Sequence, residues 1–427
     1  MSRQATINKT IGFCFLSIFF TNAVIASENK LEEFGDIMQF ALPLTAWGST
    51  FIYGDKEGRM QFYKHGATAL TIGTLGKGIF KKTRPNASSS KTSFPSGHTN
   101  GAFIGATFLN TRYGMWWGIP AYTAAVVTAY SRVDADAHNV DDVIAGASLA
   151  FFSNLFWVSP YDSNITITPT ASGDSTGISL TVTDKKPKLR SRSIDGAPKY
   201  RFSLGFGPAY MAQNSFTAPF QGGTPFDLAD FEGTTNPQTT AVPAISWFLG
   251  DQHTLALSLS PYEARDFGRF SETVNFNGTV FPANIEIRSA YRMTEVRVAY
   301  DYDFAKVASF EFRVGASLIY TRTVLELYTT EGPALLEKID DKMWLPLLNL
   351  GLDYEISRKW SFAADVSAIS LSEDKQVDGS LLFSYQFDQH WDGAFGYTFY
   401  SRDIETSTLA NRARYDILTL VAGYSFF

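Results

Sequence analysis

Three short polar clusters between Lys77 and Asp142 carry side chains that could act on an anion. The first cluster, residues 77–85, reads KGIFKKTRP. Lys77 and Arg84 are seven residues apart, so a helix would project both cations from one face, and Pro85 favours the end of that helix. Two such cations suit a phosphate dianion, to which an arginine adds a bidentate fork. A basic helix end that merely faces solvent is the alternative.

The second cluster is the segment SFPSGHT at residues 93–99, which opens an apolar stretch of helical character. A Pro-Ser-Gly turn at the start of a helix offers the Ser96 hydroxyl, an unhindered backbone at Gly97 and unpaired helix N–H groups. Together these groups favour an anion site. His98 could protonate a leaving oxygen. The alternative is a helix cap beside an incidental histidine.

The third cluster, residues 131–142, reads SRVDADAHNVDD. His138 and Asp142 are four residues apart and stack on one face if the segment is helical. The carboxylate could then accept from one ring nitrogen and leave the other as a nucleophile, and Arg132 adds a third cation. A buried structural His–Asp pair is the alternative. The remaining acids are interpreted as solvated rather than catalytic: Asp134, Asp136 and Asp141.

In order and in spacing, these clusters resemble the three-part signature of the type 2 phosphatidic acid phosphatase superfamily. The matching pattern is Lys77-x6-Arg84-Pro85, then Pro95-Ser96-Gly97-His98, then Ser131-Arg132-x5-His138-x3-Asp142. That superfamily also includes bacterial acid phosphatases and vanadium haloperoxidases. The resemblance covers about residues 34–160, implies a helical bundle there, and says nothing of the remaining chain.

The resemblance also implies a role for each residue. His138 would attack phosphorus and form a phosphohistidine, Asp142 would orient it, and His98 would act as general acid. Five groups would hold the phosphoryl oxygens: Lys77, Arg84, Arg132, the Ser96 hydroxyl and the Gly97 amide. The chemistry needs no metal and no other cofactor. A haloperoxidase that holds vanadate with the same cations is the alternative within the family.

Two kinds of element must position these residues. From Leu31 to about Pro160, apolar residues recur at helical spacing, and the main apolar stretches are residues 101–109, 121–130 and 143–158. These stretches are interrupted by Gly, Ser and Asn, or are shorter than the ~20 residues that span a bilayer. The pattern therefore predicts a compact all-α bundle. Alternation at residues 164–168 and 177–182 predicts a small hairpin.

From Tyr200 onward the period changes to two, with apolar and charged faces alternating over long segments. Short turns alternate with long polar loops (residues 214–239, 265–281 and 329–341), and the final residues YSFF resemble the closing strand of outer-membrane proteins. These features predict a C-terminal antiparallel transmembrane β-barrel of about ten strands. About twelve strands result if the loop around residues 275–280 is itself a hairpin, because Asn277-Gly278 is a strong turn signal. A soluble β-sandwich is the alternative.

The first residues have the three parts of a secretory signal peptide: basic Arg3 and Lys9, an apolar run over 11–20, and small residues before a cut after Ala26. An uncleaved anchor is the alternative. The chain has a single cysteine, Cys14, which excludes a disulfide framework; this residue falls inside the apolar run. We expect a signal peptide at 1–26, the phosphatase-like domain at 27–162, a hairpin and basic linker at 163–199, and the barrel at 200–427.

Composition limits the function further. The 427 residues are 45% hydrophobic and 18% charged, which excludes a mainly disordered chain. With 36 basic and 42 acidic residues, a nucleic-acid partner is not expected. We expect a bacterial phosphatase at the periplasmic side of the outer membrane, in contact with outer-membrane lipids, that hydrolyses a phosphorylated lipid or a small phosphoester. A pore or structural barrel with an inactive enzyme domain is the alternative from another class.

Overall fold

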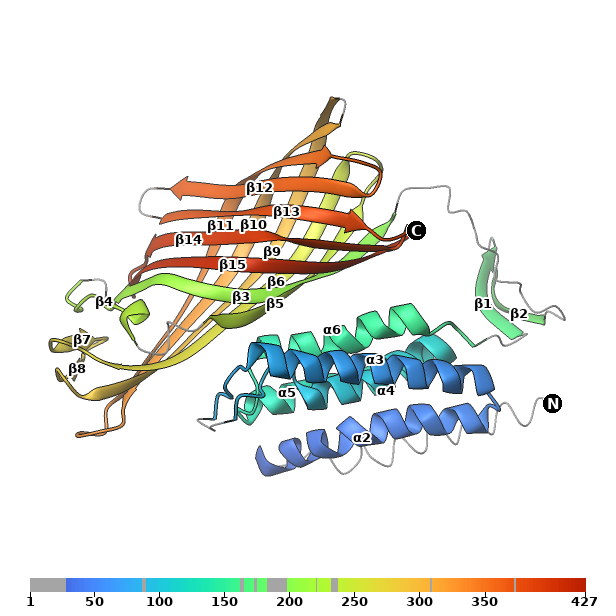
Figure 1. Ribbon diagram of the computed structural model, residues 1–427, viewed down its shortest axis with the longest axis horizontal. Coiled ribbons are helices and arrows are strands. Elements are labelled where there is room, and N and C mark those ends of the chain that lie inside the picture. The colour runs from blue at the N-terminus through green and yellow to red at the C-terminus, as the bar shows by residue number, and fades with distance from the viewer. Residues whose placement is uncertain are drawn as a thin grey trace. The chain divides into compact units, whose positions relative to one another are not determined.

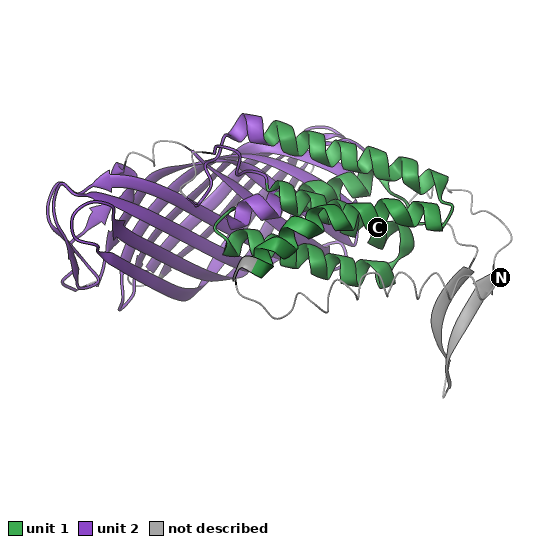
Figure 2. Ribbon diagram, turned by 90° about the horizontal axis from the view of Figure 1, so that it is seen from below, with its two compact units in different colours: residues 1–76, 96–137, 146–195 green, residues 77–95, 138–145, 196–427 purple. Residues whose placement is uncertain are grey.

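The computed structural model describes residues 28–86, 90–161, 165–172, 175–182, 198–219, 221–231, 237–307, 309–371 and 374–427. The expected signal peptide and the basic part of the linker lie outside these ranges. The described chain divides into two compact units (Figure 2). Unit 1 holds residues up to 76, 96–137 and 146–195; unit 2 holds residues 77–95, 138–145 and 196–427.

The helical region predicted from periodicity is confirmed. Among the described residues it contains five helices: α2 (Glu28–Ile52), α3 (Lys56–Phe80), α4 (Gly97–Tyr113), α5 (Met115–Asp134) and α6 (Val140–Trp157). The core of unit 1 forms where α4 packs on α2 and α5. Gly105 allows the close approach of α4 to α2, since a Cβ there would lie 2.3 Å from the Leu42 carbonyl carbon. No helix in the described ranges is both long and apolar enough to cross a membrane.

The C-terminal alternation forms a closed antiparallel barrel of ten strands, in which β15 pairs with β3 (Figure 1). Its strands are β3 (Tyr200–Thr217), β5 (Gln238–Phe248), β6 (His253–Arg269), β9 (Glu286–Val307), β10 (Phe310–Thr329), β11 (Leu336–Glu355), β12 (Trp360–Leu371), β13 (Asp374–Gln386), β14 (Trp391–Glu405) and β15 (Ala410–Phe426). Shorter elements are β1 (Ile165–Ser172), β2 (Ser175–Val182), β4 (Phe226–Asp227), η1 (Leu228–Asp230), β7 (Val274–Phe276) and β8 (Thr279–Phe281).

Two details of the strand prediction are settled by this topology. Asn277 and Gly278 do turn a hairpin, with φ values of 51° and 88°, but β7 and β8 pair only with each other. The wall therefore has ten strands and not twelve. The loop expected over residues 329–341 is much shorter, because β11 already begins at Leu336. The predicted hairpin of β1 with β2 is present.

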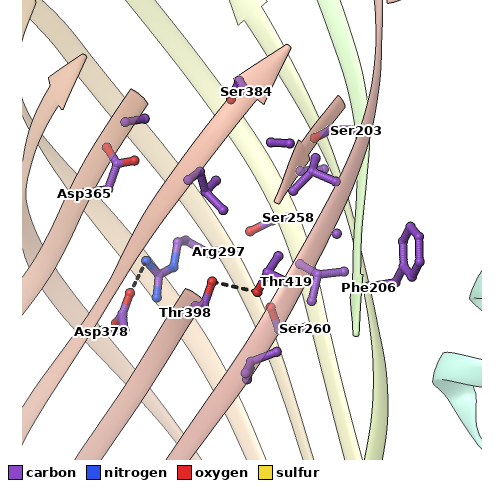
Figure 3. A pocket seen from close by; sticks show the side chains of 18 of the residues that line it. Ser203, Phe206, Ser258, Ser260, Arg297, Asp365, Asp378, Ser384, Thr398 and Thr419 are labelled. Carbon is purple, nitrogen blue, oxygen red and sulfur yellow. Dashed lines mark hydrogen bonds and ion pairs between the residues drawn. The ribbon is translucent and has the colours of Figure 1, made fainter. Parts of the chain in front are cut away.

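The two faces of the wall differ in polarity. Large apolar side chains are exposed along its outside, among them Val298, Leu318, Trp344, Leu348, Leu350, Phe395 and Leu418. Inside, a cavity of about 730 Å³ is lined by hydroxyl and charged side chains, including the ion pair of Arg297 with Asp378 at 2.8 Å (Figure 3). An apolar exterior around a polar interior is typical of a membrane barrel, since a soluble sandwich buries its apolar face.

The lumen has two different halves. The cavity runs from the short-turn end, at Arg201 and Gln386, to the phenol rings of Tyr262, Tyr400 and Tyr415. Beyond these rings, the end with the long loops is filled by a buried apolar core. Side chains from the loops contribute to this core, namely Leu228, Phe231, Phe270, Phe276 and Phe281, which are at most 5% exposed. Loop and strand side chains of the described residues therefore share one apolar core at that end of the barrel.

Because this apolar core fills the long-loop end of the lumen, we expect the full-length protein to show no steady ion conductance in planar lipid bilayers. Replacing residues 270–284 by a short Gly-Ser turn removes Phe276 and Phe281, and we expect the variant to conduct. Heat-modifiable migration in electrophoresis controls for barrel folding. Steady conductance by the unaltered protein would contradict the closed lumen, as would a folded variant that stays silent.

Candidate active site

The first predicted cluster does not form a continuous helix. α3 ends at Phe80, and Lys81 takes a left-handed φ of 47°, so the expectation that Lys77 and Arg84 share one helical face is wrong. A left-handed residue cannot continue a right-handed helix, and the chain turns away before Pro85. Lys77 remains in the last turn of α3, where its Nζ donates to the carbonyls of residues 92 and 95 at 2.7 Å each. It thereby fixes the loop that precedes α4.

A third basic residue of this segment, Lys82, forms a buried ionic cluster. Its Nζ lies 2.6 Å from Asp141 Oδ2 and 3.1 Å from Asp142 Oδ1, and all three side chains are at most 4% exposed. The interpretation of Asp141 as a solvated acid is therefore wrong. A buried carboxylate is costly unless a cation pairs with it. Lys82 supplies the cation for both carboxylates.

Asp142 links this cluster to the predicted nucleophile. Its Oδ2 accepts from Ser93 Oγ at 2.5 Å and from the Asn139 backbone N–H at 2.9 Å, and lies 3.6 Å from His138 Nδ1. α6 begins only at Val140, so His138 precedes the helix rather than stacking within it. The Asn139 bond instead folds the His138 loop back onto the Asp142 carboxylate.

The charge states follow from these contacts. Burial alone would raise the pKa of Asp142, but Lys82, His138 and Ser93 together hold it below its usual range, so the carboxylate is ionised. Burial lowers the pKa of His138 despite Asp142, and Arg84 and Lys77 lower it further. The imidazole is consequently neutral near pH 7, the form that a nucleophile requires.

The Arg84 side chain in unit 2 carries a buried hydrogen-bond donor that no group of the described residues satisfies. Its Nε is buried without a hydrogen-bond partner in the described structure. Burial and the nearby Arg84 also lower the pKa of Lys77. Mutually repelling cations and an unpaired buried N–H are the condition in which an anion is stabilising. Unit 2 therefore brings Lys77, Arg84, His138 and Asp142 together.

The second cluster begins α4 as predicted. Ser96 is the residue before the helix, and its Oγ accepts from the Thr99 N–H at 3.4 Å and from Thr99 Oγ1 at 3.1 Å. Gly97 and His98 are the first two helical residues. Gly146 of α6 lets the two helices meet here, because a Cβ would lie 2.5 Å from the Ser96 carbonyl oxygen.

Arg132 lies in the last turn of α5 and is engaged on all three nitrogens. It donates from Nε to Ser131 Oγ at 3.2 Å, from Nη1 to Asp36 Oδ1 at 2.8 Å, and from Nη2 to the Glu32 carbonyl at 2.5 Å. Asp36 Oδ1 also lies 3.1 Å from His98 Nε2. Unit 1 therefore joins Arg132 to His98 through a carboxylate of α2.

Sequence reasoning missed three residues of these clusters. Lys82 is one of several lysines in a basic segment, and nothing in its spacing separates it from a solvated cation. Ser93 lies just before the Pro-Ser-Gly turn, and a lone hydroxyl there only weakly indicates a functional residue. Asp36 lies far from the signature, on a helix of mixed polarity. In the described ranges, no group of three or more His, Cys, Asp or Glu side chains could hold a metal ion.

Replacing Lys82 by Met should destabilise the helical region by about 3–5 kcal/mol, because Asp141 and Asp142 would stay buried without their cation. Thermal unfolding followed by near-UV circular dichroism measures the loss. Lys81→Met is the matched control at an exposed neighbour and should change the free energy of unfolding little. Adding Asp141→Asn to Lys82→Met should recover part of the loss. Equal stability of Lys82→Met and Lys81→Met would show that the ionic cluster is not structural.

Comparisons with known proteins match part of the chain to one family and to two curated relatives. Residues 15–164 match the PAP2 superfamily. The lipid A 4'-phosphatase of Helicobacter pylori is 32% identical over 145 residues, which are 30% of this chain and 69% of that protein. The lipid A 1-phosphatase of Porphyromonas gingivalis is 35% identical over 89 residues, so the chain matches only 20% of the length of that relative.

Two solved structures each align with part of the chain. The outer membrane protease OmpT of Escherichia coli aligns with 53% of this chain and 97% of its own, at 8% identity and a TM-score of 0.34. LpxE of Aquifex aeolicus aligns with 33% of this chain and 92% of its own, at 21% identity and a TM-score of 0.28. The sequence matches carry the assignment: through its N-terminal region, the chain belongs to the PAP2 superfamily.

Proposed function

We propose that the protein is a phosphatase that hydrolyses phosphate monoesters or diphosphates of lipids through a phosphohistidine intermediate. One observation carries the proposal: His138 is buried, neutral and held against an ionised Asp142, with Lys77 and Arg84 lowering its pKa further. A neutral imidazole among cations is suited to attack an anionic phosphoryl group.

The reaction has two balanced steps. Nδ1 of His138 faces Asp142, so Nε2 attacks phosphorus; the P–O bond to the leaving group breaks, and His98 gives its proton to the leaving oxygen. Water then attacks the phosphohistidine, the P–N bond breaks and inorganic phosphate leaves, while the proton of the water returns to His98. The growing charge on phosphoryl oxygens is balanced by Lys77, Arg84, Arg132, Ser96 and the Gly97 amide.

We propose a phosphorylated lipid as the substrate. Both relatives described above are named lipid A phosphatases, which favours lipid A among the lipid phosphates. The apolar exterior of the barrel supports an outer-membrane location, because single-chain barrels of this kind belong to that membrane. The enzyme domain would then act at the periplasmic face, where an anchored enzyme meets phosphorylated head groups.

Phosphate release from detergent-dispersed lipid phosphates tests the nucleophile. We expect His138→Ala to lower turnover by about 10³-fold or more, as loss of a covalent catalyst does. His253→Ala, at the start of β6, is the matched control and should keep full turnover. Lipid A, phosphatidic acid and a polyprenyl diphosphate form the substrate panel. Turnover retained by His138→Ala in the folded protein would remove His138 from this role.

The pH dependence of kcat/KM gives a second test. The neutral imidazole reacts, and burial lowers the pKa of His138 from its usual 6.5, so the acid limb of the kcat/KM profile should lie below pH 6.5. The ionisation of the substrate phosphate is measured separately by ³¹P NMR and divided out. A corrected acid limb at or above pH 6.5 would contradict the effect assigned to burial.

A further inference from the structure

The first turns of α2 are built to hold Arg132. Gly35 faces it: a Cβ at this position would lie 2.3 Å from Ser131 Oγ and 2.8 Å from Arg132 Nη2. The Glu32 carbonyl accepts from that same Nη2, and the arginine side chain is only 3% exposed. The Glu32 carbonyl and the Ser131 hydroxyl thus hold two nitrogens of the guanidinium without the side chain of Asp36.

Asp36 places a single oxygen between two groups of the signature. Its Oδ1 lies 2.8 Å from Arg132 Nη1 and 3.1 Å from His98 Nε2. These are hydrogen-bond distances that an anionic oxygen other than a carboxylate could equally take, a phosphoryl oxygen included. The Asp36 side chain is 52% exposed, unlike the buried carboxylates Asp141 and Asp142. Rotation about its χ1 would carry the carboxylate into solvent without opening the core.

We propose that Asp36 is an internal competitor of phosphate: its carboxylate takes the place of a phosphoryl oxygen on Arg132 and His98 and leaves when the phosphoryl group binds. This inference rests on the proposed function in treating Arg132 and His98 as ligands of the phosphoryl group. No covalent bond changes in the exchange. A carboxylate and a phosphate dianion repel one another too strongly to share these donors.

The exchange has a consequence for turnover. If the Asp36 carboxylate occupies the site most of the time, the affinity of the site for every phosphoryl ligand falls in proportion to the fraction of time that the site is open. Inorganic phosphate, the common product, is therefore released more readily. Asp36 would limit product inhibition, and a long lipid substrate would compensate for the weaker head-group binding through its acyl chains.

Asp36→Asn tests the inference because it removes the charge and keeps the shape. Calorimetry with inorganic phosphate on the purified full-length protein measures the effect without turnover. We expect phosphate to bind about tenfold tighter to Asp36→Asn, the factor for a site open a tenth of the time. The inhibition constant of inorganic phosphate as a product of the variant should fall by the same factor, and kcat should change little. Asp36→Ala, which removes the whole carboxylate, should also bind phosphate tighter.

Glu33→Gln is the matched control, since it removes one exposed negative charge from the same turn of α2. It should leave phosphate affinity within about twofold, the scale of a screened surface charge. Unchanged or weaker phosphate binding by Asp36→Asn would overturn the proposal. So would a large loss of kcat at unchanged affinity, which would make Asp36 a positioning residue for His98. If the unaltered protein hydrolyses no lipid phosphate but Asp36→Asn still binds phosphate tighter, the proposed function fails and the competitor role stands.

Discussion

The buried Lys82 ammonium between Asp141 and Asp142 is the interaction on which the candidate site depends. It keeps Asp142 ionised in a buried place, and the same carboxylate then fixes Ser93, the Asn139 N–H and the His138 ring. Segments from two distant parts of the chain, residues 77–95 and 138–145, are joined in this way. Without the cation, Asp141 and Asp142 at the start of α6 would be buried without a countercharge.

Much of the architecture follows from sequence patterns, because each pattern reflects one physical requirement. Alternation along β9 and β10 requires a sheet with two different faces. The number of such segments predicted a barrel of about ten strands, and the wall has ten. The apolar stretch after Gly97 predicted α4, and Ser96 was expected at its start. The three-part signature likewise located His138 beside Asp142. These predictions depend on near neighbours or on repetition, which a single sequence displays directly.

Other features depend on the backbone or on distant contacts, which the sequence does not display. The left-handed φ of Lys81 ends α3 early and places Arg84 outside it. Asp141 looked like an exposed first-turn acid, and only the fold reveals Lys82 against it. Asp36 reaches Arg132 because Gly35 allows two helices to approach closely, a contact between residues about a hundred positions apart. The roles proposed for the signature residues remain predictions.

Trapping the covalent intermediate tests most directly whether this ionic cluster makes His138 a nucleophile. Rapid quenching in base after mixing with ³²P-labelled lipid phosphate should give a labelled protein whose phosphate is stable to base and released by acid. Peptide mapping should place the label on His138. A label on serine or aspartate in a parallel acid quench would contradict the account. So would turnover at a normal rate without any labelled protein at the earliest times of the base quench.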